Sequence, residues 1–224
     1  MWGIASSSPD DAWQASFRTE PPTPLAPLHP AIRSILDAEA PGSPFDAVPV
    51  AELRAVRETL MLRRQRRNEP VARIEHRAIP QPEGEIAVRV FVPARRNARR
   101  PVLVYYHGGG WVLGNLDTHE DVCRTLANRS NAVVVSVDYR RAPEHRFPGP
   151  LDDCCAAARW CAACAGDFGG DGTRLAVGGD SAGGNLAAAV AIRFRDEGGP
   201  PLKLQCLIYP VANCAFDTLS YHSV

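Results

Sequence analysis

Short apolar runs alternate with longer amphipathic stretches along most of this chain. The runs are rich in β-branched and other apolar residues, and turn residues separate them, which is typical of β-strands. This pattern predicts strands at residues 74–79, 86–92, 102–106, 132–137, 175–177 and 204–209. The run at 132–137 is apolar except for Ser136, as expected for a strand that is buried on both faces of a parallel sheet.

Between these runs, apolar residues recur every three or four positions, which predicts helices. In one such stretch Leu53, Val56 and Leu60 share a face, and arginines lie opposite. The predicted helices cover residues 31–40, 50–67, 118–128, 151–165 and 185–197. Strands that alternate with helices indicate an α/β fold, with a mostly parallel central sheet flanked by helices.

The beginning of the chain lacks this alternation. Residues 1–30 contain several prolines, which predicts a loose arm. Two of the predicted helices follow before the strands begin at Ile74. We therefore expect an arm with helices over residues 1–73 and the α/β core over residues 74–224.

The composition narrows the possible partners. The 224 residues are enough for one sizeable domain. The 25 basic residues equal the 25 acidic ones, so no net field attracts nucleic acid or an anionic membrane. Residues 1–30 lack the features of a targeting segment, and the apolar run at 186–192 is too short to span a bilayer. We expect a cytoplasmic protein with no nucleic-acid partner and no membrane-spanning segment.

Four of the seven cysteines lie close together in one predicted helix, at Cys154, Cys155, Cys161 and Cys164. Such a group suggests a metal or redox site. However, no second pair and no nearby histidine completes a tetrahedral set of ligands. We interpret these cysteines as half-buried helix residues among alanines, and we expect no metal.

The pattern G-x-S-x-G occurs at residues 179–183, directly between the predicted strand 175–177 and a predicted helix. A strand that turns sharply into a helix exposes the serine oxygen at its tip, so Ser181 is the candidate nucleophile. Only glycine or alanine is expected to fit two positions away, because the backbone there lies close to neighbouring strands. Alone, the pattern equally fits a glycine-rich turn with a surface serine.

A second motif favours the catalytic interpretation. The segment His-Gly-Gly-Gly-Trp at 107–111 follows the predicted strand 102–106. Acyl transfer through a serine builds negative charge on a carbonyl oxygen, and N–H groups of a glycine-rich loop can point at that oxygen without obstruction. The two motifs serve two halves of one mechanism, which predicts a serine hydrolase.

Together these motifs resemble the hormone-sensitive-lipase-like branch of the α/β-hydrolase fold, a family of carboxylesterases and lipases. The matching segments are residues 107–111, 115–119, 138–145, 179–188 and 209–211. The resemblance extends from about Ile74 to the end of the chain. Because no long apolar lid segment is evident in the sequence, we expect substrates with short to medium acyl chains. The resemblance implies that the helices before Ile74 cap the active site and that small-molecule esters are the substrates. It implies no metal and no organic cofactor.

The resemblance also implies a role for each motif residue. Ser181 would be the nucleophile. The other residues implied in the site are Gly109, Gly110 and Ala182 as oxyanion-hole donors, Gly108 as the residue that shapes this loop, and Trp111 and Asp180 beside the substrate pocket. His107 would brace the glycine loop, and Glu144 and His145 would organise another loop.

A serine triad also needs a carboxylate and a histidine, which in this fold follow the serine in that order. Asp217 and His222 have the right order, but they lie five residues apart in one segment, whereas the fold brings the two partners from separate strand ends. We expect instead that the last strands, with the acid and the histidine, are missing. The strand at 204–209 would then be an exposed sheet edge, which predicts self-association.

Two alternatives to ester hydrolysis stay open. A small-molecule-binding protein without catalysis, or an inactive fragment, could use the same scaffold. Amide hydrolysis would use the same serine and oxyanion hole.

Overall fold

The central feature of the structure, a computed structural model, is a six-stranded sheet with the strand order β1-β2-β4-β3-β5-β6. The structure describes residues 29–38, 48–65, 69–82, 84–95, 99–213 and 215. Contacts divide the chain into two units. Helix α2 (Pro30–Ala38) belongs to one of them, and the other spans Pro44–Cys214 and holds the sheet.

The sheet is mixed at one end and parallel at the other. Strand β2 runs antiparallel to both β1 and β4, whereas β3, β4, β5 and β6 are mutually parallel. The strands are β1 (Arg73–Gln81), β2 (Gly84–Val92), β3 (Arg100–Tyr106), β4 (Val133–Val137), β5 (Gly170–Asp180) and β6 (Leu202–Ile208). This arrangement confirms the predicted α/β fold with a mostly parallel central sheet.

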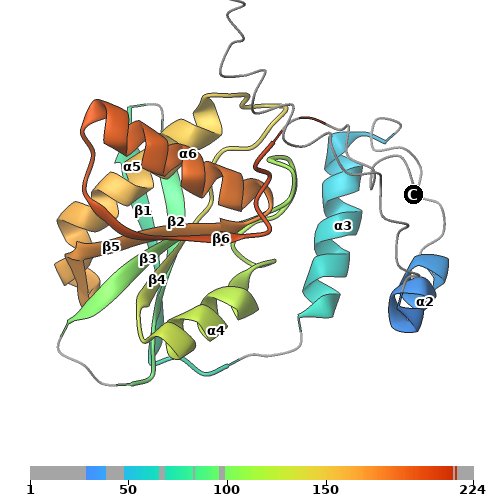
Figure 1. Cartoon of the computed structure of the whole chain (residues 1–224), viewed down its shortest axis with the longest axis horizontal. Helices are drawn as coiled ribbons and strands as arrows, with labels where there is room; N and C mark the ends of the chain where they lie inside the picture. The colour runs from blue at the N-terminus through green and yellow to red at the C-terminus, as the bar shows by residue number, and fades with distance from the viewer. Residues whose placement is uncertain are drawn as a thin grey trace, which may run out of the picture. The chain divides into compact units, whose positions relative to one another are not determined.

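Helices cover both faces of the sheet (Figure 1). One face packs against α4 (Glu120–Ser130), and the other packs against α5 (Gly149–Cys164) and α6 (Ala182–Glu197). A short 3₁₀ turn, η2 (Ala165–Phe168), follows α5. Among the described residues no helix has the length and apolarity needed to cross a membrane.

Each interior strand contributes side chains to both faces, because successive residues of a strand point to opposite sides. In β3, Val102, Val104 and Tyr106 are buried with α5 and α6, while Leu103 and Tyr105 are buried with α4. The continuous apolar pattern that predicted a strand buried on both faces is confirmed by β4, every residue of which is buried.

Two predicted elements around the G-x-S-x-G pattern are longer than their apolar runs. Strand β5 extends to Asp180, and α6 begins at Ala182. The prediction ended the strand at Val177 because Gly178, Gly179 and Asp180 are not apolar. They continue the strand because β3 and β6 pair with Gly178 and Gly179 from both sides, and β6 also pairs with Asp180.

Helix α3 (Val50–Arg64) lies in the larger unit together with the sheet, since that unit begins at Pro44. The sequence-based boundary after residue 73 therefore falls inside this unit. The capping role of α3 stays a prediction.

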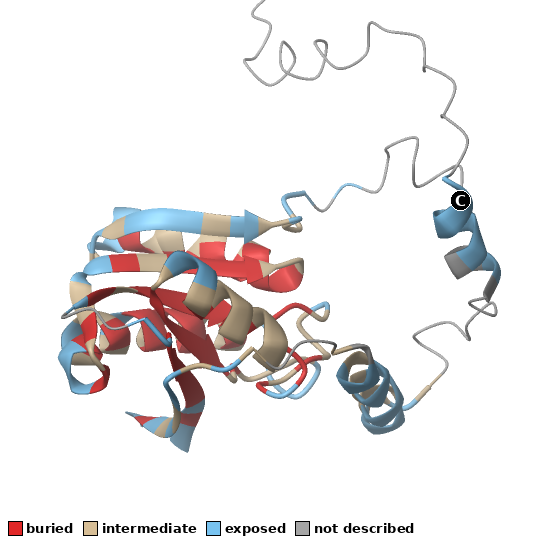
Figure 2. Cartoon of the chain, turned by 90° about the horizontal axis from the view of Figure 1, so that it is seen from below, coloured by how far each residue is buried: buried red, intermediate tan, exposed pale blue. Residues whose placement is uncertain are grey.

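Strand β6 pairs with β5 alone among the described strands. Its outer edge is largely exposed, as the pale blue strand at the border of the sheet shows (Figure 2). Leu204 is 62% exposed and Leu207 39% exposed, which is unusual for apolar residues of a strand.

Candidate active site

Ser181 lies at the sharp turn between β5 and α6, with φ 52° and ψ −117°. Such values are strained for a residue with a side chain and typify a nucleophile elbow. The turn is held by its backbone: the Ser181 N–H donates to the Ile208 carbonyl at 2.9 Å, and its carbonyl accepts from Val211 at 3.2 Å.

The glycines on either side of Ser181 are required by close approach to β3. A Cβ atom added to Gly179 or to Gly183 would overlap the carbonyl oxygen of Tyr106. The prediction that small residues are needed here is confirmed. The part that also allowed alanine is wrong, since even one methyl group has no room.

The glycine loop follows β3 and carries three consecutive residues with positive φ: 125° at Gly109, 61° at Gly110 and 61° at Trp111. The Gly109 carbonyl accepts hydrogen bonds from Val112 at 3.1 Å and Leu113 at 2.8 Å, which closes the turn. Within the described residues, the N–H groups of Gly109 and Gly110 donate to no other residue. They are therefore available to a ligand.

Asp180 connects the elbow to the glycine loop. Its Oδ1 atom accepts from the Gly108 N–H at 2.9 Å and from the Tyr105 hydroxyl at 2.7 Å, and it lies 3.4 Å from His119 Nε2. Burial raises the pKa of the Asp180 carboxyl, but hydrogen bonds from His119, Tyr105 and Gly108 outweigh this effect, so the pKa lies below its ordinary value. Asp180 thus lies under the glycine loop as an anion.

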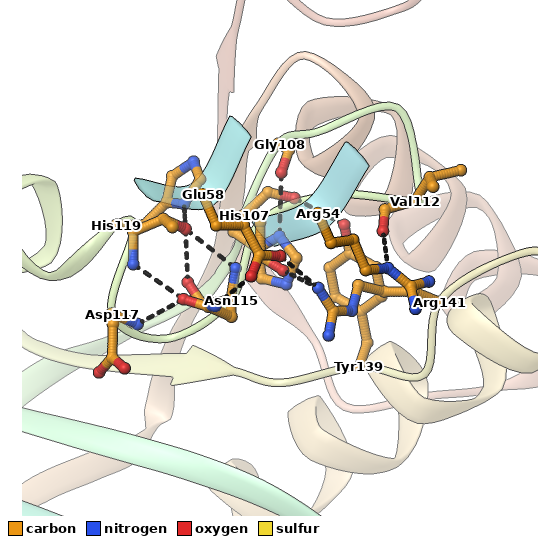
Figure 3. A network of polar contacts seen from close by, with 12 residues as sticks. Arg54, Glu58, His107, Gly108, Val112, Asn115, Asp117, His119, Tyr139 and Arg141 are labelled. Atoms are coloured by element: carbon orange, nitrogen blue, oxygen red, sulfur yellow. Dashed lines mark hydrogen bonds and ion pairs between the residues drawn. The ribbon is translucent and has the colours of Figure 1, made fainter. Parts of the chain in front are cut away.

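His107 is buried beneath the glycine loop. Its ring stacks on Tyr139 with centroids 4.3 Å apart, and its Nδ1 atom lies 3.0 Å from the Gly108 carbonyl, to which it donates (Figure 3). The Tyr139 hydroxyl donates to the His107 carbonyl at 2.7 Å. Burial lowers the pKa of His107 to about 3, so the ring is neutral at pH 7. These contacts agree with a bracing role.

An apolar cavity of about 320 Å³ lies between the glycine loop and the start of α6. Trp111 contributes to its wall from the loop, and Leu186 contributes from the helix, five residues after Ser181. Leu151 of α5 and Phe147 add to the apolar lining. Asp180 is not part of this wall, whereas Trp111 is.

Glu144 and His145 belong to the loop after β4. The Glu144 carboxylate binds the Arg54 guanidinium of α3 through two contacts of 2.8 Å, and this bond lowers the pKa of Glu144 to about 2. The His145 N–H donates to the Arg141 carbonyl at 2.9 Å. Both residues therefore lie in contacts that hold this loop.

The remaining candidates are the possible triad partners of Ser181 and the cysteines of α5. Asp217 and His222 lie outside the described residues. Cys154 and Cys161 are fully buried free thiols, so they are more buried than we expected. The part of the chain that the structure describes holds no group of three or more possible metal ligands.

Three residues that hold the loops of this site were not predicted from the sequence. His119 stands in one of the quoted segments, but its contact with Asp180 had no sequence signal. Arg54 and Glu58 belong to an arginine-rich helix in which nothing marks them out. Arg54 lies 58 and 88 residues from the two carbonyl groups that it binds.

Comparison with known proteins gave consistent matches. A sequence model of the alpha/beta hydrolase fold matches residues 103–223. Carboxylesterase NlhH of Mycobacterium tuberculosis is 46% identical over 195 residues, which cover 86% of this chain and 60% of the relative. Esterase LipI of the same species is 44% identical over 185 residues, which cover 82% of this chain and 57% of LipI.

Solved structures give the same result. An esterase from Pyrobaculum calidifontis is 48% identical, with a TM-score of 0.76 over 84% of this chain and 60% of that protein. A thermostable esterase from Pseudomonas putida is 36% identical, with a TM-score of 0.78 over 85% of this chain and 60% of that protein. The chain therefore spans about three fifths of the length of these proteins.

Proposed function

Because this chain belongs to the α/β-hydrolase family, we propose that it carries the nucleophile and the oxyanion hole of a carboxylesterase. Within the family, its motifs favour the hormone-sensitive-lipase-like branch. The observation that carries the proposal is the strained elbow at Ser181, which Asp180 links to a glycine loop with two available N–H groups. The proposal is supported by the relatives named above as carboxylesterases and esterases.

In the proposed reaction, the Ser181 hydroxyl attacks the ester carbonyl carbon while a histidine accepts its proton. The N–H groups of Gly109, Gly110 and Ala182 receive the resulting oxyanion. Ala182 is the first residue of α6, so its N–H has no acceptor within that helix. The carbon–oxygen bond then breaks, the alcohol leaves with the proton, and water hydrolyses the acyl-enzyme.

The proton acceptor has two candidate sources. His222, with Asp217 as its carboxylate, is the histidine after Ser181 in this sequence. Alternatively, the acid and the histidine belong to a part of the protein that these 224 residues do not include. The mechanism needs neither a metal nor an organic cofactor, because the serine, the base and the backbone donors supply every step.

The proposed substrates are small esters with short to medium acyl chains. The apolar cavity of about 320 Å³ next to Trp111 and Leu186 suits such a chain. A cytoplasmic location stays a prediction from the sequence.

A direct test is hydrolysis of p-nitrophenyl butyrate by the 224-residue chain, with Ser181→Ala as the inactive variant. Ser130→Ala is the matched control, because Ser130 lies at the end of α4 and donates only to the Leu126 carbonyl among the described residues. If His222 is the base, we expect turnover by the wild type and by Ser130→Ala, and none by Ser181→Ala. If the base lies outside these 224 residues, we expect all three to be inactive. Turnover that survives Ser181→Ala would exclude Ser181 as the nucleophile.

A third variant, His222→Ala, separates the two sources of the base. Loss of turnover would support His222, and unchanged turnover would exclude it. Saturable binding of the ester without product would favour the second candidate function, a small-molecule-binding protein that uses the same apolar cavity.

A further inference from the structure

The backbone of Trp111 is strained. Its φ of 61° follows two positive values at Gly109 and Gly110, but glycine adopts such values freely and tryptophan does not. A strained residue keeps its conformation only when its surroundings hold it. Trp111 adjoins the two available N–H groups, so whatever holds Trp111 also sets their direction.

Two hydrogen bonds hold the carbonyl groups of Trp111 and its neighbour. The Ala142 N–H donates to the Trp111 carbonyl at 2.9 Å. Arg54 Nε donates to the Val112 carbonyl at 2.9 Å, and Nη2 donates to the Ala142 carbonyl at 2.8 Å. The Arg54 side chain also binds Glu144, and it is 19% exposed. One guanidinium group from α3 therefore ties the glycine loop to the loop after β4.

Glu58 lies one turn after Arg54 on the same face of α3, where residues four apart are neighbours. Its Oε1 atom accepts from Arg141 at 2.8 Å, and its Oε2 atom accepts from the Asn115 amide at 3.0 Å. Arg141 also donates to the Gly114 carbonyl. Figure 3 shows Arg54 and Glu58 pointing from α3 into this network. Glu58 thus ties the same two loops together through Arg141 and Asn115.

We propose that Arg54 and Glu58 are positioning residues, by which α3 holds the glycine loop in the conformation that aims the Gly109 and Gly110 N–H groups at the oxyanion. This inference rests on the proposed function. Neither residue touches the reacting atoms. Their removal lets Trp111 relax toward negative φ and turns both N–H groups away. Because those hydrogen bonds strengthen in the transition state, kcat falls and KM changes little.

Hydrogen exchange tests whether Arg54 holds the conformation of the glycine loop, and this test does not depend on catalysis. The variant is Arg54→Gln, and the matched control is Arg63→Gln, the same charge change at an exposed position of α3. We expect the amides of Val112 and Leu113, which close the loop turn, to exchange at least tenfold faster in Arg54→Gln only. Strand β4 should be unchanged. Equal exchange in both variants would overturn the proposal.

Arg54→Lys and Glu144→Gln extend this test. Lysine keeps the charge but lacks the forked donors, so Arg54→Lys should behave like Arg54→Gln. If Arg54→Lys instead restores wild-type exchange, the charge alone acts and the positioning role is wrong. If Arg54→Gln does not fold, Glu144→Gln replaces it, because it weakens the same ion pair from the loop.

Hydrolysis of p-nitrophenyl butyrate tests the catalytic half. We expect Arg54→Gln and Glu58→Gln to lower kcat at least tenfold with KM within threefold of wild type, and Arg63→Gln to leave both unchanged. Faster loop exchange with an unchanged kcat would overturn the catalytic half. If the wild type does not hydrolyse the ester, either the base lies outside these 224 residues or the proposed function fails, and the exchange comparison still decides whether α3 holds the loop.

Discussion

The Oδ1 atom of Asp180 accepts a hydrogen bond from the backbone N–H of Gly108 at 2.9 Å. This bond joins the residue before Ser181 to the first glycine of the loop at the end of β3. The elbow and the glycine loop are therefore one hydrogen-bonded unit, and a change in either one displaces the other.

We predict that Asp180→Asn weakens both the fold and the site. The amide keeps one acceptor oxygen but loses the charge that strengthens the bonds from Gly108, Tyr105 and His119. The free energy of unfolding should fall by about 1–3 kcal/mol. Urea denaturation measures this loss, and kcat/KM should fall with it. Asp196→Asn, an exposed site on α6, is the control and should change neither quantity.

We predict that Gly183→Ala destabilises the protein, because the added methyl group overlaps the carbonyl oxygen of Tyr106. Overpacking against backbone costs about 1–3 kcal/mol, since the strand itself must shift. Gly166→Ala is the matched control: its Cβ would meet nothing within 4 Å. Thermal unfolding of both variants decides the point. An equal melting temperature for the two would contradict the close approach seen at the elbow.

We predict that His107 makes stability depend on pH. Burial lowers its pKa to about 3 in the folded chain, whereas an unfolded histidine has a pKa of about 6.5. Between these values the unfolded state binds a proton that the folded state does not. Protonation of His107 therefore leaves the free energy of unfolding unchanged above about pH 6.5. Between pH 6.5 and about pH 3 it lowers this free energy by about 1.4 kcal/mol per pH unit.

Urea midpoints between pH 4 and pH 7 measure this dependence. The variant His107→Asn should flatten the profile, and His76→Asn, at an exposed position of β1, should leave it unchanged. An identical slope in wild type and His107→Asn would show that other groups cause it.

We predict that the chain self-associates through β6, with a second copy as the partner. A strand that is paired on one side presents N–H and C=O groups to another chain, and two copies of one edge pair by a two-fold axis. The exposed Leu204 and Leu207 add apolar contact. Sedimentation velocity should show a concentration-dependent dimer that Leu204→Lys reduces. Leu62→Lys, at an exposed position of α3, is the control. A monomer at all concentrations would contradict the prediction.

Local patterns were enough to predict most of the elements. The apolar run of β4 and the periodicity of α5 depend on neighbours a few residues away, so they are visible without the fold. The predicted strand before Ser181 was too short, because its last residues depend on partners that are distant in the sequence. Gly178, Gly179 and Asp180 become strand residues only because β3 and β6 lie beside them.

The candidate site also has features that local motifs predict and contacts that depend on the fold. The sequence by itself determined the α/β class, Ser181 in its elbow and the glycine loop, since these motifs are short and each needs its residue types in a fixed local order. Only the tertiary structure decided that Asp180 bonds to Gly108 and Tyr105, and that Arg54 reaches Val112 and Ala142. Partners 58 to 88 residues apart meet through strand order and helix packing, which no local pattern encodes.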